Sequence, residues 1–278
     1  MLAFFKHRIL NKTSKKINSN RYILDSLSDV GLSRGNNEDS VITITHPTNP
    51  SLKLLAVADG VGGKENGEVA SSFAVDTLRE WFITTPEHKL ENSNYLTRNI
   101  EKTIKFINNF LYFTKNDECS TTLTCAVINA NDTIIANVGD SRAYIVNDDE
   151  MMQVTRDDSL VWYYYEQGEL SKDQIRFHKG SSLITKSIGS DLDVDPEISK
   201  ISNSNYKGLL LCTDGVTDCL SDSKLAQLIR GRKSNLAKNI INEAVYGNPP
   251  KRAPKGKEFH IPINGKDNAS VALYLKTS

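Results

Sequence analysis

Four short apolar segments between residues 121 and 155 constrain the fold most, because turns of only two or three residues separate them. Segments joined by such short turns pair as antiparallel strands, since a parallel pair needs a crossover of roughly a dozen residues. We therefore expect an antiparallel meander in this part of the chain. The four segments are residues 121–129, 133–139, 142–147 and 151–155.

Helical patterns flank further strands and indicate the fold class. Residues 65–82 and 96–111 place apolar side chains at helical spacing on one face, and another helical pattern covers residues 223–245. Paired strands followed by paired helices favour an α+β fold, with segregated layers, over a doubly wound parallel sheet. The other strand-like segments are residues 41–45, 52–58, 208–215 and 269–275.

Composition excludes several classes of protein. The chain has 278 residues, of which 38% are hydrophobic and 24% are charged, as in ordinary globular domains. Its net charge is zero, which gives no general attraction to nucleic acid or to an acidic membrane. No apolar run approaches the roughly 18 residues of a transmembrane helix. The four cysteines form no C-x-x-C pair, so we expect reduced thiols in a cytoplasmic protein.

Three segments do not fit the regular pattern of strands and helices. Residues 1–21 hold six basic residues and no acid, and their apolar portion is too short for a signal peptide. We expect a flexible basic arm there, with a weak membrane or partner contact as the sharper alternative, followed by one domain over residues 22–278. Residues 156–190 and 247–268 do not fit a plain layer and are interpreted as surface insertions near a site.

Two apolar strands end in the same way, with an aspartate followed by a glycine. Asp59 ends "LLAVADG" and Asp214 ends "LLLCTDG", while Asp39, Asp140 and Asp267 also lie at ends of predicted strands. Each could simply cap a turn. Strand ends in one layered domain converge, however, and carboxylates gathered there would repel one another and be costly to desolvate. A hard divalent cation removes that cost, and oxygen-only ligands suit Mg²⁺ or Mn²⁺.

Glycine and arginine residues beside these acids fit the same hypothesis. Gly60 and Gly62 would let a backbone carbonyl approach a metal ion closely. Arg34, in "RGNNED", is most simply a salt-bridge partner of Glu38 or Asp39. Next to metal ligands, its planar guanidinium could instead bind two oxygens of a phosphoryl group.

Six motifs in this order resemble those of the bacterial type-2C metal-dependent serine/threonine protein phosphatases. The resemblance covers about residues 25–276 and implies two packed antiparallel sheets flanked by helices, a catalytic domain over residues 22–278, and a variable flap at 156–190. Two departures are Val61, where some members carry an acid-donating histidine, and Ser120, where the family usually has glycine. The motifs are "RGNNEDS", "AVADGVGG", "STTLTCAVI", "ANVGDSRAYIV", "LLLCTDGVTDCL" and "GKDNASVAL".

The resemblance also implies a metal centre at one end of the sandwich. Asp59 would bridge two Mn²⁺ or Mg²⁺ ions, and Gly60 would offer its carbonyl to one of them. Asp214 and Asp267 would complete the ligands of the other ion. Asp140 would bind the weaker third ion of bacterial members.

The function implied by the resemblance is hydrolysis of phosphoserine and phosphothreonine in proteins. Metal-activated water would attack the phosphorus without a covalent enzyme intermediate, and Arg34 would bind the substrate phosphate. Asp39, with Glu38 beside it, would contact the centre directly or through water. The expected partners are phosphoproteins, with a cognate kinase as a further candidate. The alternative is a catalytically weak pseudophosphatase that regulates partners by binding, and the presence of every expected ligand argues against it.

Overall fold

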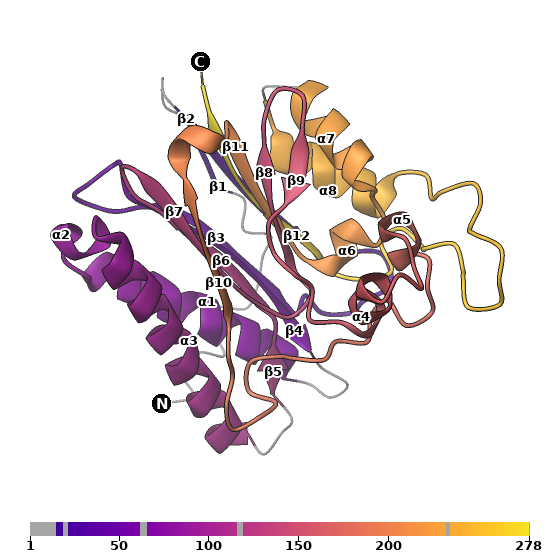
Figure 1. Ribbon diagram of the computed structural model, residues 1–278, viewed down its shortest axis with the longest axis horizontal. Helices are drawn as coiled ribbons and strands as arrows, with labels where there is room; N and C mark the ends of the chain where they lie inside the picture. The colour runs from indigo at the N-terminus through magenta and orange to yellow at the C-terminus, as the bar shows by residue number, and fades with distance from the viewer. Residues whose placement is uncertain (1–14, 19–21, 62–65, 116–118, 232–233, 278) are drawn as a thin grey trace.

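The chain folds into two antiparallel sheets that lie face to face, with helices covering both outer faces (Figure 1). This arrangement confirms the predicted α+β sandwich. The computed structural model describes residues 15–18, 22–61, 66–115, 119–231 and 234–277. In Figure 1 the purple helices α1–α3 lie on one side of the sandwich, and the orange helices α7 and α8 lie on the other.

The first sheet, here called the β4 sheet, has the strand order β10-β7-β6-β4-β3, and β5 pairs with β4 outside that order. Its strands are β3 (Asp39–Thr45), β4 (Lys53–Val61), β5 (Ser120–Thr121), β6 (Leu123–Ile128), β7 (Asp132–Val138) and β10 (Glu197–Ser202). The helices on this side are α1 (Gly67–Thr84), α2 (Glu87–Leu90) and α3 (Ser93–Lys115).

The second sheet, here called the β11 sheet, has the order β1-β2-β12-β11-β8-β9. Its strands are β1 (Lys15–Asn18), β2 (Tyr22–Asp29), β8 (Arg142–Val146), β9 (Met151–Gln153), β11 (Gly208–Cys212) and β12 (Ala269–Lys276). The helices α6 (Asp214–Thr217), α7 (Asp222–Gly231) and α8 (Leu236–Tyr246) lie beside it. The flap contributes α4 (Leu160–Glu166) and α5 (Lys172–Ile175), and a 3₁₀ turn, η2, covers Asn203–Asn205.

Strands β4 and β11 are buried on both faces, which explains their continuous apolar runs. In β4, Leu54 packs toward the helices, whereas its neighbour Leu55 packs between the sheets. In β11, Leu210 and Leu211 divide between the two cores in the same way. Each fully buried side chain of this size contributes about 1.5–3 kcal/mol to stability. The two strands that end in Asp-Gly are thus fixed in the centre of the molecule.

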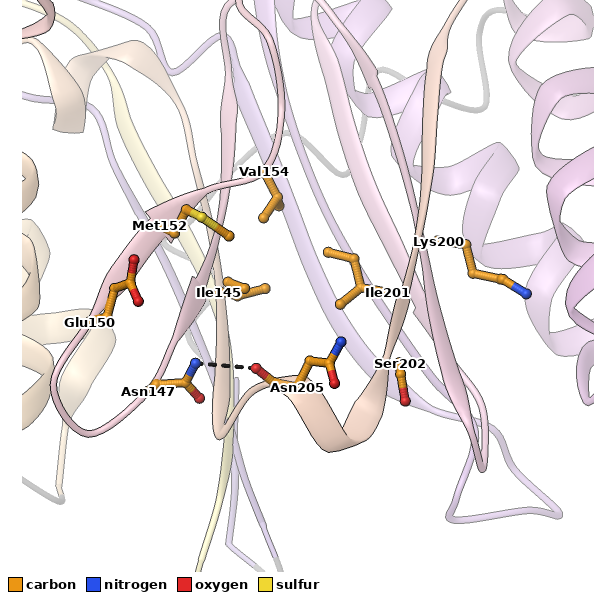
Figure 2. A pocket seen from close by; sticks show the side chains of 9 residues that line it. All are labelled: Ile145, Asn147, Glu150, Met152, Val154, Lys200, Ile201, Ser202 and Asn205. Atoms are coloured by element: carbon orange, nitrogen blue, oxygen red, sulfur yellow. Dashed lines mark hydrogen bonds between the residues drawn. The ribbon is translucent and has the colours of Figure 1, made fainter.

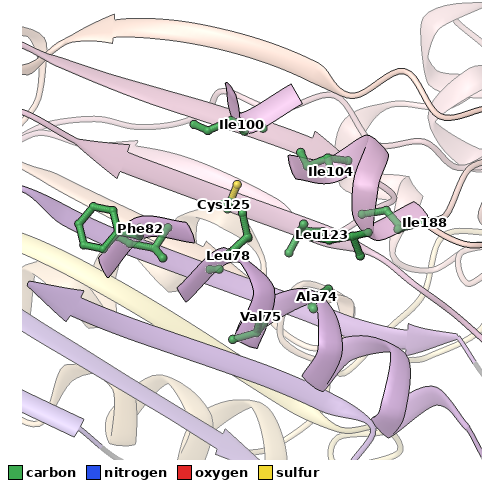
Figure 3. Packing of buried hydrophobic residues seen from close by; sticks show 14 of the residues in the cluster. Ala74, Val75, Leu78, Phe82, Ile100, Ile104, Leu123, Cys125 and Ile188 are labelled. Atoms are coloured by element: carbon green, nitrogen blue, oxygen red, sulfur yellow. The ribbon is translucent and has the colours of Figure 1, made fainter. Parts of the chain in front are cut away.

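The helical side of the β4 sheet shows how the amphipathic patterns are used. Helix α1 packs on β4 and β3, and α3 packs on β7, so their apolar faces form one cluster with β6 residues (Figure 3). The residues that meet there include Ala74, Leu78, Phe82, Ile100, Ile104, Leu123 and Cys125.

Several expectations need correction. The predicted meander is divided, because β6 pairs with β7 and β8 pairs with β9, but β7 and β8 belong to different sheets. Gly139, with φ of 102°, lies in the turn where the chain crosses from one sheet to the other. The helix predicted over 223–245 is two helices, and Asn235 precedes the second with a left-handed φ of 53°. Strands β2 and β10 were not predicted.

The predicted basic arm is only partly within the described residues. Residues 1–14 and 19–21 lie outside them, while Lys15–Asn18 form β1 and pair with β2. The flexibility of the remainder stays a prediction. In the described part of the chain, no helix combines the length and the apolar character needed to cross a bilayer.

Candidate metal centre

Two of the predicted aspartates face one another at the end of the β4 sheet. Asp39 opens β3, and Asp59 lies directly opposite it in the antiparallel register of β4. Thr122 fixes the backbone here, because its amide donates to the Asp59 carbonyl at 2.8 Å and its hydroxyl accepts from the Asp59 amide at 2.9 Å. The pair is therefore positioned by strand register, and Thr121 also donates to the Asp59 carbonyl at 2.9 Å.

The β11 sheet brings two more aspartates to the same end. Asp214 is the first residue of α6, directly after β11, and Asp267 lies just before the neighbouring strand β12. Gly215 permits this approach, since a Cβ at that position would lie 1.9 Å from the carbonyl oxygen of Asn268. Asp140, in the turn after β7, is buried and experiences the charge of Asp214.

Close packing also requires glycine at position 60, in addition to the expected approach of its carbonyl to a metal ion. A Cβ there would lie 2.3 Å from the carbonyl oxygen of Gly67 and 2.7 Å from that of Glu38. The first turn of α1 therefore packs directly on the backbone of β4. Residues 62–65, which include the expected Gly62, lie outside the described residues.

Hydrogen bonds across the two sheets lock the acids in place. The Thr213 hydroxyl donates to Asp39 Oδ2 at 2.9 Å and accepts from the Ser270 amide at 3.0 Å. Asn268, which is buried, accepts from the Glu38 amide at 2.8 Å through its side-chain oxygen. Its side-chain nitrogen donates to two carbonyl groups of the loop before β3. Thr213 and Asn268 thus join the Asp39 loop to β11 and β12.

Arg34 lies at the solvent side of the acidic cluster. Its Nη2 donates to Asp267 Oδ2 at 2.8 Å, and its Nη1 lies 3.9 Å from Glu38 Oε2. The Arg34 side chain remains 44% exposed. The salt bridge expected with Glu38 is thus present at long range, and the shorter contact is with Asp267.

Burial and mutual repulsion raise the acid pKa values in this cluster. Burial raises the pKa of Asp39 to about 8, despite the Thr213 hydrogen bond. Burial, followed by the charges of Asp214 and Asp39, raises the pKa of Asp59 well above its ordinary value. The pKa of Asp140 is raised by burial and by Asp214. These carboxylates are poorly stabilised as anions unless a cation is close.

The donor set fits a hard divalent cation. Asp39 Oδ1, Asp214 Oδ1 and Glu68 Oε2 are buried oxygens without a hydrogen-bond partner. Such groups are costly unless something binds them. Across residues 15–18, 22–61, 66–115, 119–231 and 234–277, no three acidic, histidine or cysteine side chains enclose an ion by themselves. Carboxylate oxygens still suit Mg²⁺ or Mn²⁺, because these ions keep several water ligands and accept backbone carbonyls.

The sequence reasoning missed Asp218, which follows Asp214 by one helical turn. Its amide donates to the Asp214 carbonyl at 2.7 Å. Burial, followed by the charge of Asp214, raises the Asp218 pKa well above its ordinary value. The i, i+4 spacing in "TDGVTD" was the signal that could have identified it, since such residues share one helix face.

Residues 156–190, the predicted flap, lie next to the turn between β7 and β8. Val161, Trp162, Leu170 and Ile175 form a small hydrophobic cluster of its own. Asp158 accepts from the Gly139 amide at 3.1 Å, so the flap is anchored beside the turn that carries Asp140.

One groove of the described residues lies away from the acidic cluster. It has a volume of about 400 Å³ and lies between the β8–β9 hairpin and β10. Figure 2 shows Ile145 and Ile201 pointing toward one another across it, while Lys200 points away. Its β10 residues pair with the start of β7, whereas Asp140 follows the end of β7. The groove is therefore at the other end of β7 from Asp140.

Comparison with known proteins agrees with the geometry. A family model described as protein phosphatase 2C matches residues 33–246. The serine/threonine phosphatase stp of Listeria innocua is 30% identical over 213 residues, covering 74% of this chain and 82% of the relative.

Solved structures give the same assignment. The serine/threonine phosphatase Stp1 from Staphylococcus aureus is 28% identical, with a TM-score of 0.79 and coverage of 98% of this chain and 99% of that one. The catalytic domain of PstP, in complex with two manganese ions, is 25% identical, with a TM-score of 0.74 and coverage of 93% and 99%. Because the family model matches well over half of its length, the chain belongs to the protein phosphatase 2C family.

Proposed function

We propose that this protein is a metal-dependent phosphatase that hydrolyses phosphoserine and phosphothreonine in proteins. The observation that carries the proposal is the convergence of buried and half-buried aspartates from both sheets beside one partly exposed arginine, Arg34. Family membership and the names of the relatives support it.

The metal ligands in this proposal are the aspartates at the strand ends. Asp59 would bridge two Mn²⁺ or Mg²⁺ ions, the Gly60 carbonyl would bind one of them, and Asp214 and Asp267 would bind the other. Asp140 would hold a third ion. The two manganese ions in the PstP structure support this ligand chemistry. When bound, such ions activate water for attack and offset the charge of the phosphoryl oxygens.

The chain's own groups have separate roles around these ligands. Arg34 would bind the phosphoryl oxygens through its planar fork, exchanging its contact with Asp267 for the substrate. Asp39 and Glu38 would contact the centre directly or through water. Thr213 would hold Asp39 with one carboxylate oxygen still available.

The deciding experiment measures phosphate release from a phosphothreonine peptide with Mn²⁺ and with EDTA. We expect turnover only with Mn²⁺, and its loss in Asp59→Asn, because that change removes the ligand shared by both ions. Asp148→Asn, a change at an exposed acid outside the cluster, serves as the matched control. Full turnover by Asp59→Asn would refute the assignment. Peptide binding without phosphate release at any Mn²⁺ concentration would indicate a pseudophosphatase.

The proposed partners are phosphoproteins together with the kinase that phosphorylates them. The proposed location is the cytoplasm, where thiols stay reduced. The four cysteines support that location, because all are buried thiols.

A further inference from the structure

We propose that residues 248–260, here called the basic loop, bind acidic residues that flank the phosphorylation site of the substrate. The inference rests on the proposed phosphatase function and names the substrate class that this chain favours. The loop begins just after residue 246, where the match to the family model ends. The loop therefore lies outside the residues that the family model matches.

The basic loop concentrates positive charge in a chain whose net charge is zero. Its sequence, "NPPKRAPKGKEFH", contains four cations and one acid. Lys251, Arg252, Lys255 and Lys257 are all exposed, and within the described residues none of them takes part in an ion pair. These cations are thus available to an external anion.

One end of the basic loop is fastened to the flap. The Lys179 amide donates to the Glu258 carbonyl and the His260 amide donates to the Phe177 carbonyl, each at 2.8 Å. His178 and Phe259 form the antiparallel bridge between these contacts, with their rings edge to face at 5.9 Å. In Figure 1 the yellow loop leaves α8, projects outward and returns beside α5. The loop and the flap therefore present one continuous surface.

The chain that follows leads directly to the metal centre. Gly265 accepts backbone hydrogen bonds from Leu32 at 2.7 Å and from Ser33 at 3.2 Å. Two residues later Asp267 accepts from Arg34. Lys257, the loop cation nearest in sequence, precedes Asp267 by ten positions, so the two residues are at most roughly 36 Å apart. An extended peptide whose phosphate is bound at Arg34 spans this distance with about ten residues, so a residue that close to the phosphorylated one reaches the loop.

An acidic protein segment fits this surface better than other anions. The cations are on a loop whose chain continues to Asp267, the partner of Arg34, so a flanking Asp or Glu would bind them while the phosphate occupies the centre. A single exposed ion pair contributes little to binding free energy. Several pairs together, with electrostatic steering of a charged substrate, should raise kcat/KM about tenfold.

The test compares phosphothreonine peptides that are identical except for a block of flanking Glu or Gln residues, placed on either side of the phosphothreonine. We expect the wild type to favour the acidic peptide about tenfold in kcat/KM at low salt, with the preference fading at high salt. The variant Lys251→Gln/Arg252→Gln/Lys255→Gln/Lys257→Gln should lose this preference while hydrolysing p-nitrophenyl phosphate normally. Changing the same four residues to Glu should reverse the preference, so that the neutral peptide becomes the better substrate.

A charge-matched control removes four exposed cations from α1, α2 and α3, on the other side of the sandwich. This variant, Arg79→Gln/Lys89→Gln/Arg98→Gln/Lys102→Gln, should keep the preference. The proposal is overturned if the wild type shows no preference, or if the loop variant keeps it. It is equally overturned if the loop changes abolish binding to phosphatidylserine vesicles or RNA but leave the peptide ratio unchanged.

A failure of the phosphatase assignment is distinguishable from a failure of this inference. Absence of p-nitrophenyl phosphate turnover at any Mn²⁺ concentration would contradict the phosphatase function alone. Binding of the same acidic and neutral peptides, measured by calorimetry, would then test the loop directly. Tighter binding of the acidic peptide that disappears in the four-Gln variant would still support the loop assignment.

Discussion

Arg34 stands where the acidic cluster meets solvent, and its guanidinium already binds an oxyanion, the carboxylate of Asp267. The same planar group matches two phosphoryl oxygens. We expect Arg34→Ala to lower kcat/KM for a phosphothreonine peptide by about 100-fold at saturating Mn²⁺, as expected for loss of a donor to developing charge. The Mn²⁺ concentration for half-maximal activity should change much less, because the metal ligands remain.

Arg34→Lys is the informative companion to this change. Lysine keeps the charge but not the two-pronged geometry, so its kcat/KM should lie between those of the wild type and Arg34→Ala. Steady-state kinetics across a Mn²⁺ titration would check both variants. Wild-type kinetics in Arg34→Ala at saturating metal would mean that this arginine only pairs with Asp267.

At the scale of elements, a buried ion pair joins β8 to the base of the flap. Arg142 donates to Asp157 through Nε at 2.8 Å and through Nη2 at 2.6 Å. Gln153 donates to the other Asp157 oxygen at 2.7 Å, and Tyr144 extends the network by donating to Asp222 at 3.0 Å. Arg142 is only two residues from Asp140 in sequence, so the ion pair links the flap to the acidic end of the sandwich.

We expect Asp157→Ala to lower the free energy of unfolding by about 3–5 kcal/mol, because it leaves Arg142 buried without its partner. The double change Arg142→Met/Asp157→Leu should lower the free energy of unfolding much less, because both charges are removed and apolar groups replace them. Urea denaturation of the three proteins would test this. Equal losses in the single and double variants would show that packing, rather than the unpaired charge, sets the cost.

The same scale shows what the sequence could and could not predict. Asp59 and Asp214 were identifiable because apolar strands end at each. The crossing between sheets at Gly139 was not, because a short turn does not reveal which sheet receives the next strand. Strand β2 was missed because it contains polar residues such as Asp25. That carboxylate is buried yet satisfied, by the amide of Ala237 in α8, a partner distant in sequence.

For the whole molecule, the acidic centre is where the two sheets are joined. Asp39 and Asp59 belong to the β4 sheet, whereas Asp214 and Asp267 lie at strand ends of the β11 sheet. Thr213 already bridges the sheets through Asp39. A bound cation would add ligands from both sheets, so metal binding and stability of the fold should be linked.

This linkage gives a prediction with a definite dependence on pH. Burial raises the pKa of Asp39 to about 8, and burial with neighbouring charges raises that of Asp59 well above its ordinary value. Between the ordinary aspartate pKa of about 4 and these raised values, the folded protein binds protons that the unfolded chain has released. The stability of the EDTA-treated protein should therefore fall as the pH rises from about 5 to about 8.

Mn²⁺ replaces those protons, so the stabilisation that it gives should grow over the same pH range. At about 100 times its dissociation constant, an ion adds about 2.7 kcal/mol per site, which corresponds to a rise in Tm of roughly 5 °C or more. Calorimetric scans with Mn²⁺ and with EDTA should show a larger rise at pH 8 than at pH 6. Asp59→Asn should lose most of that rise, whereas a shift that is equal at both pH values would contradict metal binding by these buried carboxylates.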